Sequence, residues 1–453
     1  MYSSLTRFAG KHLYVLGFCA RRERRTIARS PSHPELRNRF ARRSCIYCGG
    51  TNIRQKENVV PGFFERVKAR MRETEVARAI STIPVSDRPI LAYAEDDYTW
   101  GQLGPYLNAV MDEHGLPVVY VTSDTEDPRF TDHHPLMSVY PISESLSTFL
   151  PAVDSPVFVT TMPDLDSFHI KRPQASTCVY VFHSLNSIHM AYRPRAFDAY
   201  DVFFCTGPHH TEELTRYFSQ IGKTDYDLRE VGYPKLDRIA ANYRSYHKVH
   251  PDETTILIAP SWGPDNVLAA DGVSLVDTLS QAGYRVVVRP HPAFYESLYP
   301  AGVGIMSDLE RRFGDRPNVV FETSTTTEDS FMEADVMVSD WSGAALEYAL
   351  GTERPVLFLD LPPKTNNPDW EQFGVVPIED RMREEIGMVV APGDATAAIE
   401  TVNALVENAA HYQSVLADLR VQTVYNPGSA ADAGAVVLSE LAAKARGGEA
   451  SAS

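Results

Sequence analysis

Short apolar runs of strand length alternate with longer segments of helical periodicity from residue 88 onward. This alternation is typical of parallel sheets that are covered by helices. It occurs as two successive series, and we interpret the polar segment 243–252 between them as a linker. The sequence therefore predicts an α/β fold of two Rossmann-like, doubly wound domains that face a cleft, with ligands bound beyond the carboxyl ends of the strands.

The predicted strands are almost continuously apolar, which fits strands that are covered on both faces. They lie at 89–94, 117–122, 156–160, 177–182 and 201–206 in the first series, and at 255–259, 284–289, 318–321, 335–339 and 355–359 in the second. Helices are expected at 101–114, 208–219, 395–419 and 429–443. We place the first domain at 86–245, the second at 250–446 and a flexible tail at 447–453.

Positive charge is concentrated at the start of the chain. Residues 1–50 contain ten Arg and one Lys against two Glu, so this segment carries +9 and the rest carries -25 of the total of -16. The acidic remainder argues against a nucleic-acid binder, and any anionic ligand must be held by local groups. We expect residues 1–85 to form a basic arm, partly helical or disordered.

The arm suits contact with an anionic membrane surface, where each basic residue contributes about 1 kcal/mol. Its apolar run, residues 12–20, is too short to span a bilayer. The alternatives are a disordered tail or an over-extended start site. We expect a cytoplasmic protein, peripheral on the inner face of the cell membrane.

The five cysteines form no even disulfide framework, which favours a reducing compartment. Cys45 and Cys48 make a CxxC in the arm, but no second CxxC or HxxxH pair follows. We therefore predict no metal site.

The clearest candidate site follows the predicted strand at 335–339. Asp340, Ser342 and Gly343 lie in a short loop that opens a predicted helix. The N–H groups at a helix N-terminus can hold a phosphate without a cationic side chain. Ser342 is equally suited to act only as an N-cap, and the two roles are compatible.

A second candidate is Arg289-Pro290-His291-Pro292, at the end of another predicted strand. The two prolines restrict the backbone around His291 and fix its direction above the edge of the sheet. This imidazole is suited to donate to a diphosphate oxygen, although a lone histidine at a strand end is more often structural.

The third candidate lies in the first domain, where the strand at 177–182 delivers His183 into a polar loop. A neutral imidazole is a suitable general base toward an acceptor hydroxyl. We assign Ser184, Asn186 and Arg193 to binding of the acceptor, with a solvated loop as the alternative.

Two further segments are less specific. Asp97 belongs to a cluster of carboxylates, residues 95–97, that follows the first strand; the cluster is suited to receive a polyol or bind a metal, or else to cap the start of a helix. Lys235 lies in a turn-rich segment near the domain junction and adds positive charge there.

Taken in order, the segments YVFHS, GYPKLD, ILIAPSW, VVRPHP, ADVMVSDWSG and VYNPGSA resemble the CDP-glycerol glycerophosphotransferase family, which includes teichoic-acid primases and polymerases. The resemblance spans about residues 90–438. It implies a GT-B fold, His183 as catalytic base, and His291, Asp340, Ser342 and Gly343 at the donor phosphates. We also assign Arg289, Ser261 and Thr325 to donor binding. We assign Ser184, Asn186, Arg193, Asp97 and Lys235 to binding of the acceptor or alditol.

The chain departs from the family pattern at three places. The usual His-Gly-Thr is His183-Ser184-Leu185, the usual Arg after Gly-x-Pro is Lys235, and Asp-Tyr-Ser-Ser is replaced at 340–343 by DWSG. These changes leave the headgroup of the donor open.

The resemblance implies an enzyme that transfers an alditol phosphate from a CDP-linked donor to an acceptor hydroxyl in bacterial cell-surface polymer synthesis. The expected partners are the nucleotide-diphosphate donor and a lipid-linked or polymer acceptor, with no cofactor; a divalent ion is not predicted. The alternatives are a GT-B glycosyltransferase that uses a nucleotide sugar and a non-catalytic scaffold in capsule assembly.

Overall fold

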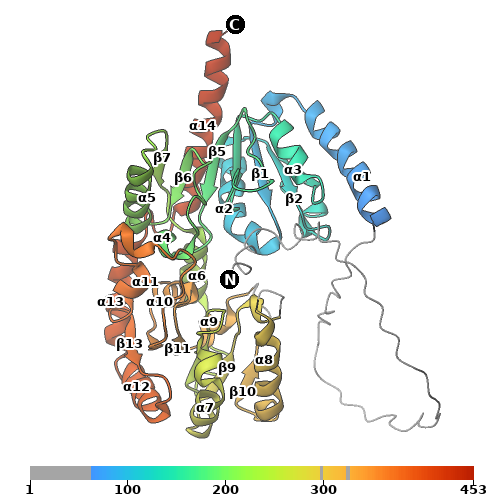
Figure 1. Cartoon of the computed structure of the whole chain (residues 1–453). Coiled ribbons are helices and arrows are strands. Elements are labelled where there is room, and N and C mark those ends of the chain that lie inside the picture. The colour runs from blue at the N-terminus through green and yellow to red at the C-terminus, as the bar shows by residue number, and fades with distance from the viewer. Residues whose placement is uncertain (1–62, 296–298, 323–326, 453) are drawn as a thin grey trace, which may run out of the picture.

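Two parallel β-sheets with helices packed on them make up the computed structural model, which describes residues 63–295, 299–322 and 327–452 (Figure 1). The first sheet has the order β3 (Met137–Pro141), β2 (Val118–Thr122), β1 (Ile90–Ala94), β4 (Val157–Thr160), β5 (Thr177–Val181), β6 (Val202–Cys205) and β7 (Asp227–Glu230). The second has the order β10 (Val319–Phe321), β9 (Arg285–Val288), β8 (Thr255–Ile258), β11 (Val336–Ser339), β12 (Val356–Leu359) and β13 (Gly387–Val390). The predicted class, two doubly wound α/β domains, is confirmed.

In both sheets the chain starts near the middle, runs to one edge, and then returns to build the other half. The order therefore reverses between β1 and β4 in the first sheet and between β8 and β11 in the second. Ligands of such sheets bind outside the carboxyl ends of the strands at this switch point. In the second domain, that point lies between Ala259 and Ser339, whose hydroxyl donates to the Ala259 carbonyl at 2.7 Å.

The central strands are buried along their whole length, as their continuous apolar character predicts. The helices that accompany the first sheet are α1 (Phe63–Thr82), α2 (Asp97–His114), α3 (Leu146–Phe149), α4 (Ile188–Ala191), α5 (Pro208–Ile221) and α6 (Pro234–Ser245). The second sheet is accompanied by α7 (Val267–Gln281), α8 (Pro300–Phe313), α9 (Asp329–Glu333), α10 (Gly343–Thr352), α11 (Ile378–Met382), α12 (Ala395–Glu407) and α13 (Ala409–Thr423), and the last helix is α14 (Ala430–Ala452).

Three strands, β3, β7 and β13, were not predicted. Each is the edge or near-edge strand of its sheet and is only partly buried. The sequence Asp-Leu-Arg-Glu of β7 shows why, since an edge strand that is half exposed need not be apolar. The helix expected at 395–419 is two helices, with Asn408 ending α12 and preceding α13.

The last helix crosses back to the first domain, which differs from the predicted boundary at residue 446. Leu438 and Ala442 of α14 are buried in the same apolar cluster as Leu103 and Leu107 of α2, and α14 lies beside the first sheet in Figure 1. The helix runs to Ala452, through the segment that we expected to be a flexible tail. Its apolar stripe is what holds it against α2.

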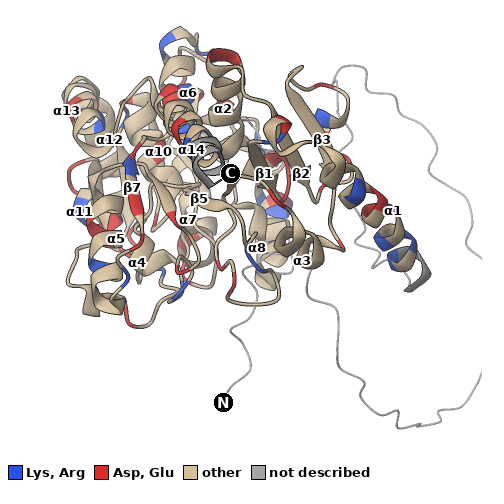
Figure 2. Ribbon diagram, turned by 90° about the horizontal axis from the view of Figure 1, so that it is seen from above, with Lys and Arg blue, Asp and Glu red and all other residues tan. Residues whose placement is uncertain are grey.

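Part of the expected basic arm is helical, since α1 covers residues 63–82. Glu73 is its anchor: it is 8% exposed and accepts hydrogen bonds from the backbone N–H groups of Ser143, Glu144 and Ser145. Both signs of charge occur along α1 (Figure 2). Residues 1–62, with Cys45, Cys48 and the +9 segment, lie outside the described residues. Within the described ranges, no helix is both long and apolar enough to span a bilayer.

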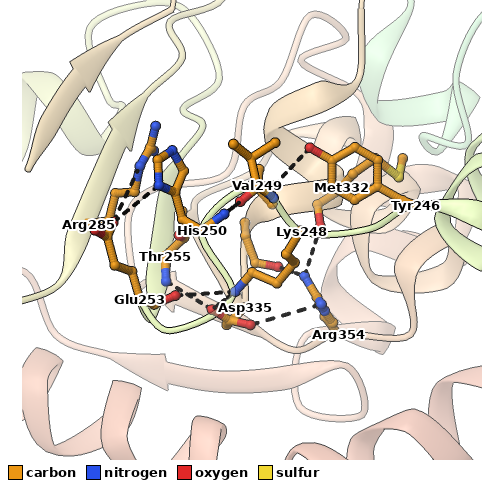
Figure 3. A network of polar contacts seen from close by, with 12 residues as sticks. Tyr246, Lys248, Val249, His250, Glu253, Thr255, Arg285, Met332, Asp335 and Arg354 are labelled. Atoms are coloured by element: carbon orange, nitrogen blue, oxygen red, sulfur yellow. Dashed lines mark hydrogen bonds and ion pairs between the residues drawn. The ribbon is translucent and has the colours of Figure 1, made fainter.

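The predicted linker is bonded to the second domain rather than loose (Figure 3). The Lys248 ammonium lies 2.8 Å from Asp335, whose carboxylate also accepts the Thr255 N–H at 2.9 Å. The Tyr246 hydroxyl donates to Glu333 at 2.8 Å. Thr255 begins β8 and Asp335 precedes β11, so the linker is fixed at the amino ends of these strands, away from the candidate site.

Candidate functional site

His183 follows β5 and begins the loop that leads to α4. Its carbonyl accepts a hydrogen bond from the Tyr233 hydroxyl at 2.9 Å, and its Nε2 lies 3.4 Å from the Tyr192 hydroxyl. Burial, with a smaller contribution from the charge of Lys235, lowers the pKa of the imidazole to about 4. The ring is therefore neutral near pH 7 and able to accept a proton.

Lys235 forms an ion pair between the two domains. Its ammonium lies 2.7 Å from Glu347 Oε2 on α10, and the Tyr233 hydroxyl is 2.7 Å from the other oxygen of the same carboxylate. The side chains of Lys235 and Glu347 are only 12% and 6% exposed. Lys235, predicted to bind the acceptor, thus acts here by joining α6 to α10 beside His183.

Asp340 holds the loop at the switch point of the second sheet. One of its oxygens accepts the Ser261 N–H and the other accepts the Val267 N–H, each at 2.9 Å. Burial raises the pKa of this carboxyl, and the two N–H donors oppose the rise. Asp340 therefore organises the loop that contains Ser261, while Ser261 itself lies at the carboxyl end of β8.

Ser342 is the N-cap of α10, and Gly343 is its first residue. This end of the helix faces the first domain. The Ser342 hydroxyl caps the helix by accepting the Ala344 N–H at 3.4 Å. A Cβ added to Gly343 would lie 2.0 Å from Oδ1 of Asn186, so a larger residue at this position would displace the Asn186 side chain. Asn186 and Gly343, assigned to acceptor and donor binding, are therefore in direct contact across the two domains.

His291 and Arg289 lie beyond β9 with different surroundings. The His291 Nδ1 accepts the Ala293 N–H at 3.1 Å, and its ring lies 6.1 Å from the ring of Trp262. The guanidinium of Arg289 instead bonds Ser330 and the Thr327 carbonyl, at 3.0 and 2.9 Å. Arg289 is thus engaged with the loop that precedes α9. Thr325 lies outside the described residues.

The remaining predicted residues have mainly structural contacts. Ser184 directly follows His183 and is partly exposed. The Arg193 Nε donates to Asp164 at 2.6 Å, so it is paired within its own domain. Asp97 is the first residue of α2 and pairs with Arg129 at 2.5 Å. The structure therefore favours the helix-start alternative for the Asp97 segment, where Asp96 is the N-cap.

Three residues around these loops were not predicted from the sequence: Trp262, Glu347 and Lys364. Trp262 is the last residue of the segment ILIAPSW, so an aromatic side chain could have been noted there. Glu347 and Lys364 belong to a helix and a long loop without any motif, so only the fold brings them to the site. Among the described residues, no three His, Cys, Asp or Glu side chains are grouped as a metal site.

Comparison with known proteins agrees with this arrangement. Residues 149–372 match the family model described as CDP-Glycerol:Poly(glycerophosphate) glycerophosphotransferase. A solved structure of the wall teichoic acid polymerase TagF is similar at a TM-score of 0.53 and 12% identity, over 85% of this chain and 99% of that chain. No curated protein matches the chain significantly in sequence.

A second similar structure is that of a protein whose name denotes a different reaction. It is a protein named as a UDP-N-acetylglucosamine 2-epimerase, from Listeria monocytogenes, with a TM-score of 0.51 and 12% identity over 76% of this chain and 94% of that chain. At such low identity, these two structures establish the fold alone, which is GT-B. The family match extends through the segments with His183, His291 and Gly343. The resemblance predicted from the sequence is therefore confirmed: over residues 149–372 the chain carries the domain of the CDP-glycerol glycerophosphotransferase family.

Proposed function

We propose that the protein transfers an alditol phosphate, glycerol phosphate or a close relative, from a CDP-linked donor to an acceptor hydroxyl in the synthesis of a bacterial surface polymer such as teichoic acid or capsule. The observation that supports this most is the family match over residues 149–372. The contact between Asn186 and Gly343 supports it further. It brings the loop of a neutral histidine beside the N-terminus of α10, so a base and a phosphate site face the same space.

In this proposal the reaction is an in-line displacement at the phosphorus that bears the alditol. His183 accepts the proton of the acceptor hydroxyl, and the acceptor oxygen forms a new bond to phosphorus. The bond from that phosphorus to the bridging diphosphate oxygen breaks, and CMP leaves with the electron pair. Reactions of this class depend mainly on positioning and on stabilisation of phosphate charge.

The donor phosphates bind at the switch point of the second sheet. The partial positive charge at the N-terminus of α10 and the imidazole of His291 stabilise negative charge there. Ser342 supplies the cap that fixes the direction of this helix end, and Asp340 fixes the neighbouring loop through Ser261. These groups act on the phosphates at short range, so they can hold an anionic substrate although the whole chain carries a net charge of -16.

The test is turnover of purified protein with CDP-glycerol and CDP-ribitol and a lipid-linked acceptor, followed by CMP release and phosphorus NMR. The wild type is expected to yield CMP and a phosphodiester product, and His183→Ala is expected to yield neither. His247→Ala, at an exposed histidine of the linker, is the matched control and is expected to behave as wild type. Release of a nucleoside diphosphate from a nucleotide sugar, with no turnover of either alditol donor, would replace the proposal with a glycosyltransferase.

We also propose that the protein works at the inner face of the cell membrane, held there by the basic arm. The support is the charge of +9 in residues 1–50. Deleting these residues is expected to weaken binding to vesicles that contain an anionic lipid, and to have no effect on vesicles without one. Unchanged binding to the anionic vesicles would remove this part of the proposal.

A further inference from the structure

Lys364 lies at the candidate donor site although no motif marks it. It belongs to the loop that follows β12, and its side chain is only partly exposed. Its ammonium lies 3.8 Å from the centre of the Trp262 ring. Trp262 directly follows Ser261, whose N–H donates to Asp340. The lysine therefore reaches the carboxyl edge of the sheet at the point where the strand order reverses.

The charge of Lys364 has no anionic partner in contact. Burial lowers the pKa of its ammonium to about 7, and the charge of Asp340 opposes this change. Both oxygens of Asp340 already accept backbone N–H groups, those of Ser261 and Val267. Within the described ranges, Lys364 makes no hydrogen bond or ion pair, and its contact is the face of the Trp262 ring. An ammonium in such a position is stabilised when an anion binds beside it.

The other cations near this edge are already engaged. Arg289 is bonded to Ser330 and to the Thr327 carbonyl, and Lys235 is paired with Glu347. Lys364 is therefore a cation, among the described residues at this edge, whose charge a bound anion would balance. The indole ring holds it in place, since an ammonium over an aromatic face is attracted to the ring while its N–H groups stay open to a ligand.

We propose that Lys364 binds the diphosphate of the donor, with its ammonium pairing with phosphate oxygens while Trp262 holds the side chain over the switch point. This inference rests on the proposed function, because it takes a nucleoside diphosphate as the ligand. The lysine thus supplies the full positive charge, and the N-terminus of α10 supplies partial charges from its N–H groups.

Donor binding is then linked to proton uptake. With a pKa of about 7, Lys364 is mostly neutral at pH 8 in the free protein. The bound diphosphate favours the charged form, so binding at pH 8 takes up about 0.9 of a proton. Asp340, which directly follows β11, is the acidic group whose charge acts on the lysine among the described residues, and both of its oxygens keep their backbone bonds.

The test is calorimetric titration of the full chain with CDP and with cytidine. Lys364→Met is expected to weaken CDP binding at least tenfold and to leave cytidine binding unchanged, because cytidine has no phosphate. Lys444→Met, at an exposed lysine of α14, is the matched control and is expected to bind both as wild type. A dissociation constant for CDP within threefold of wild type in Lys364→Met would overturn the inference.

A second measurement needs no variant. Titrating the wild type with CDP at pH 8, in two buffers of different ionisation enthalpy, gives the number of protons taken up. An uptake near one that disappears in Lys364→Met supports the inference, whereas equal uptake in both proteins contradicts it.

The two proposals fail in different ways. If CDP binds with the expected lysine dependence but no alditol phosphate is transferred, the proposed function is wrong and the role of Lys364 stands. If transfer occurs and Lys364→Met binds CDP as wild type does, only the lysine assignment is wrong. Absence of any CDP binding by the wild type overturns both.

Discussion

Replacing Glu379 with glutamine removes a buried carboxylate from the contact between the two domains. Glu379 on α11 is 5% exposed, and its Oε1 accepts the Ser187 N–H at 3.0 Å. Glu213 on α5 is fully buried and accepts the Ile188 N–H at 2.6 Å. One carboxyl group from each domain therefore meets the start of α4, at the end of the loop that carries His183.

The size of the effect follows from the pKa of Glu379. Burial raises this pKa from 4.5 to about 7, and the charge of Glu213 adds to the rise. Because the folded pKa is the higher one, the folded state favours the protonated acid. Stability is therefore lost as pH rises from about 4.5 to about 7, and the loss approaches about 3 kcal/mol above pH 7. Glutamine cannot ionise, so the variant avoids this loss.

The assay is the melting temperature of wild type and Glu379→Gln at pH 5 and pH 8, with Glu384→Gln at an exposed site as the control. The variant should melt close to wild type at pH 5 and roughly 4 °C higher at pH 8. Burial lowers the pKa values of His183 and His210, so the folded protein loses stability as pH falls below about 6.5. That contribution is common to both proteins and cancels in the difference. An equal difference at both pH values would refute the reasoning.

Three further predictions follow from the site. Gly343→Ala is expected to lower transfer activity, measured as CMP release, because the added Cβ would overlap the side-chain oxygen of Asn186. The control is Gly304→Ala, whose added Cβ would meet no atom within 4 Å, and its activity is expected to be unchanged. Lys235→Met leaves Glu347 buried without its cation and is expected to lower stability by about 3 kcal/mol, measured by thermal melting; an unchanged melting temperature would show that the pair is not needed. The low pKa of His183 places the acid limb of the kcat/KM profile near pH 4, and a limb near pH 6.5 would contradict the burial of this base.

The central strands could be predicted from the sequence because burial on both faces demands continuous apolar residues. β1 and β11 are examples, since each is fully buried and each was predicted. The strand β7 could not be predicted, because the sequence Asp-Leu-Arg-Glu has no apolar run to mark it. The position of α14 also needed the fold, since an apolar helix stripe does not say which domain it will cover.

The same distinction applies to the site. His183, Ser342 and Gly343 could be proposed from the sequence because each follows a strand in a short motif, and strand ends of parallel sheets gather at one edge. Glu347 and Lys364 were not found, because their roles arise from contacts over long sequence separations, to Lys235 and to Trp262. A sequence motif contains residues that are close together along the chain, so it cannot reveal a contact between residues that are far apart in sequence.

The loop that carries His183 is fixed by groups from both domains. Within the first domain, the Tyr233 hydroxyl donates to the His183 carbonyl. From the second domain, Glu379 accepts the Ser187 N–H, and the side-chain amide of Asn367 donates to the His189 carbonyl at 2.9 Å. Because these bonds cross the domain contact, any shift of one domain against the other moves His183 relative to the start of α10. In the proposed transfer, the distance between His183 and the donor phosphates therefore depends on how the two domains are packed, as well as on the residues that touch the substrate.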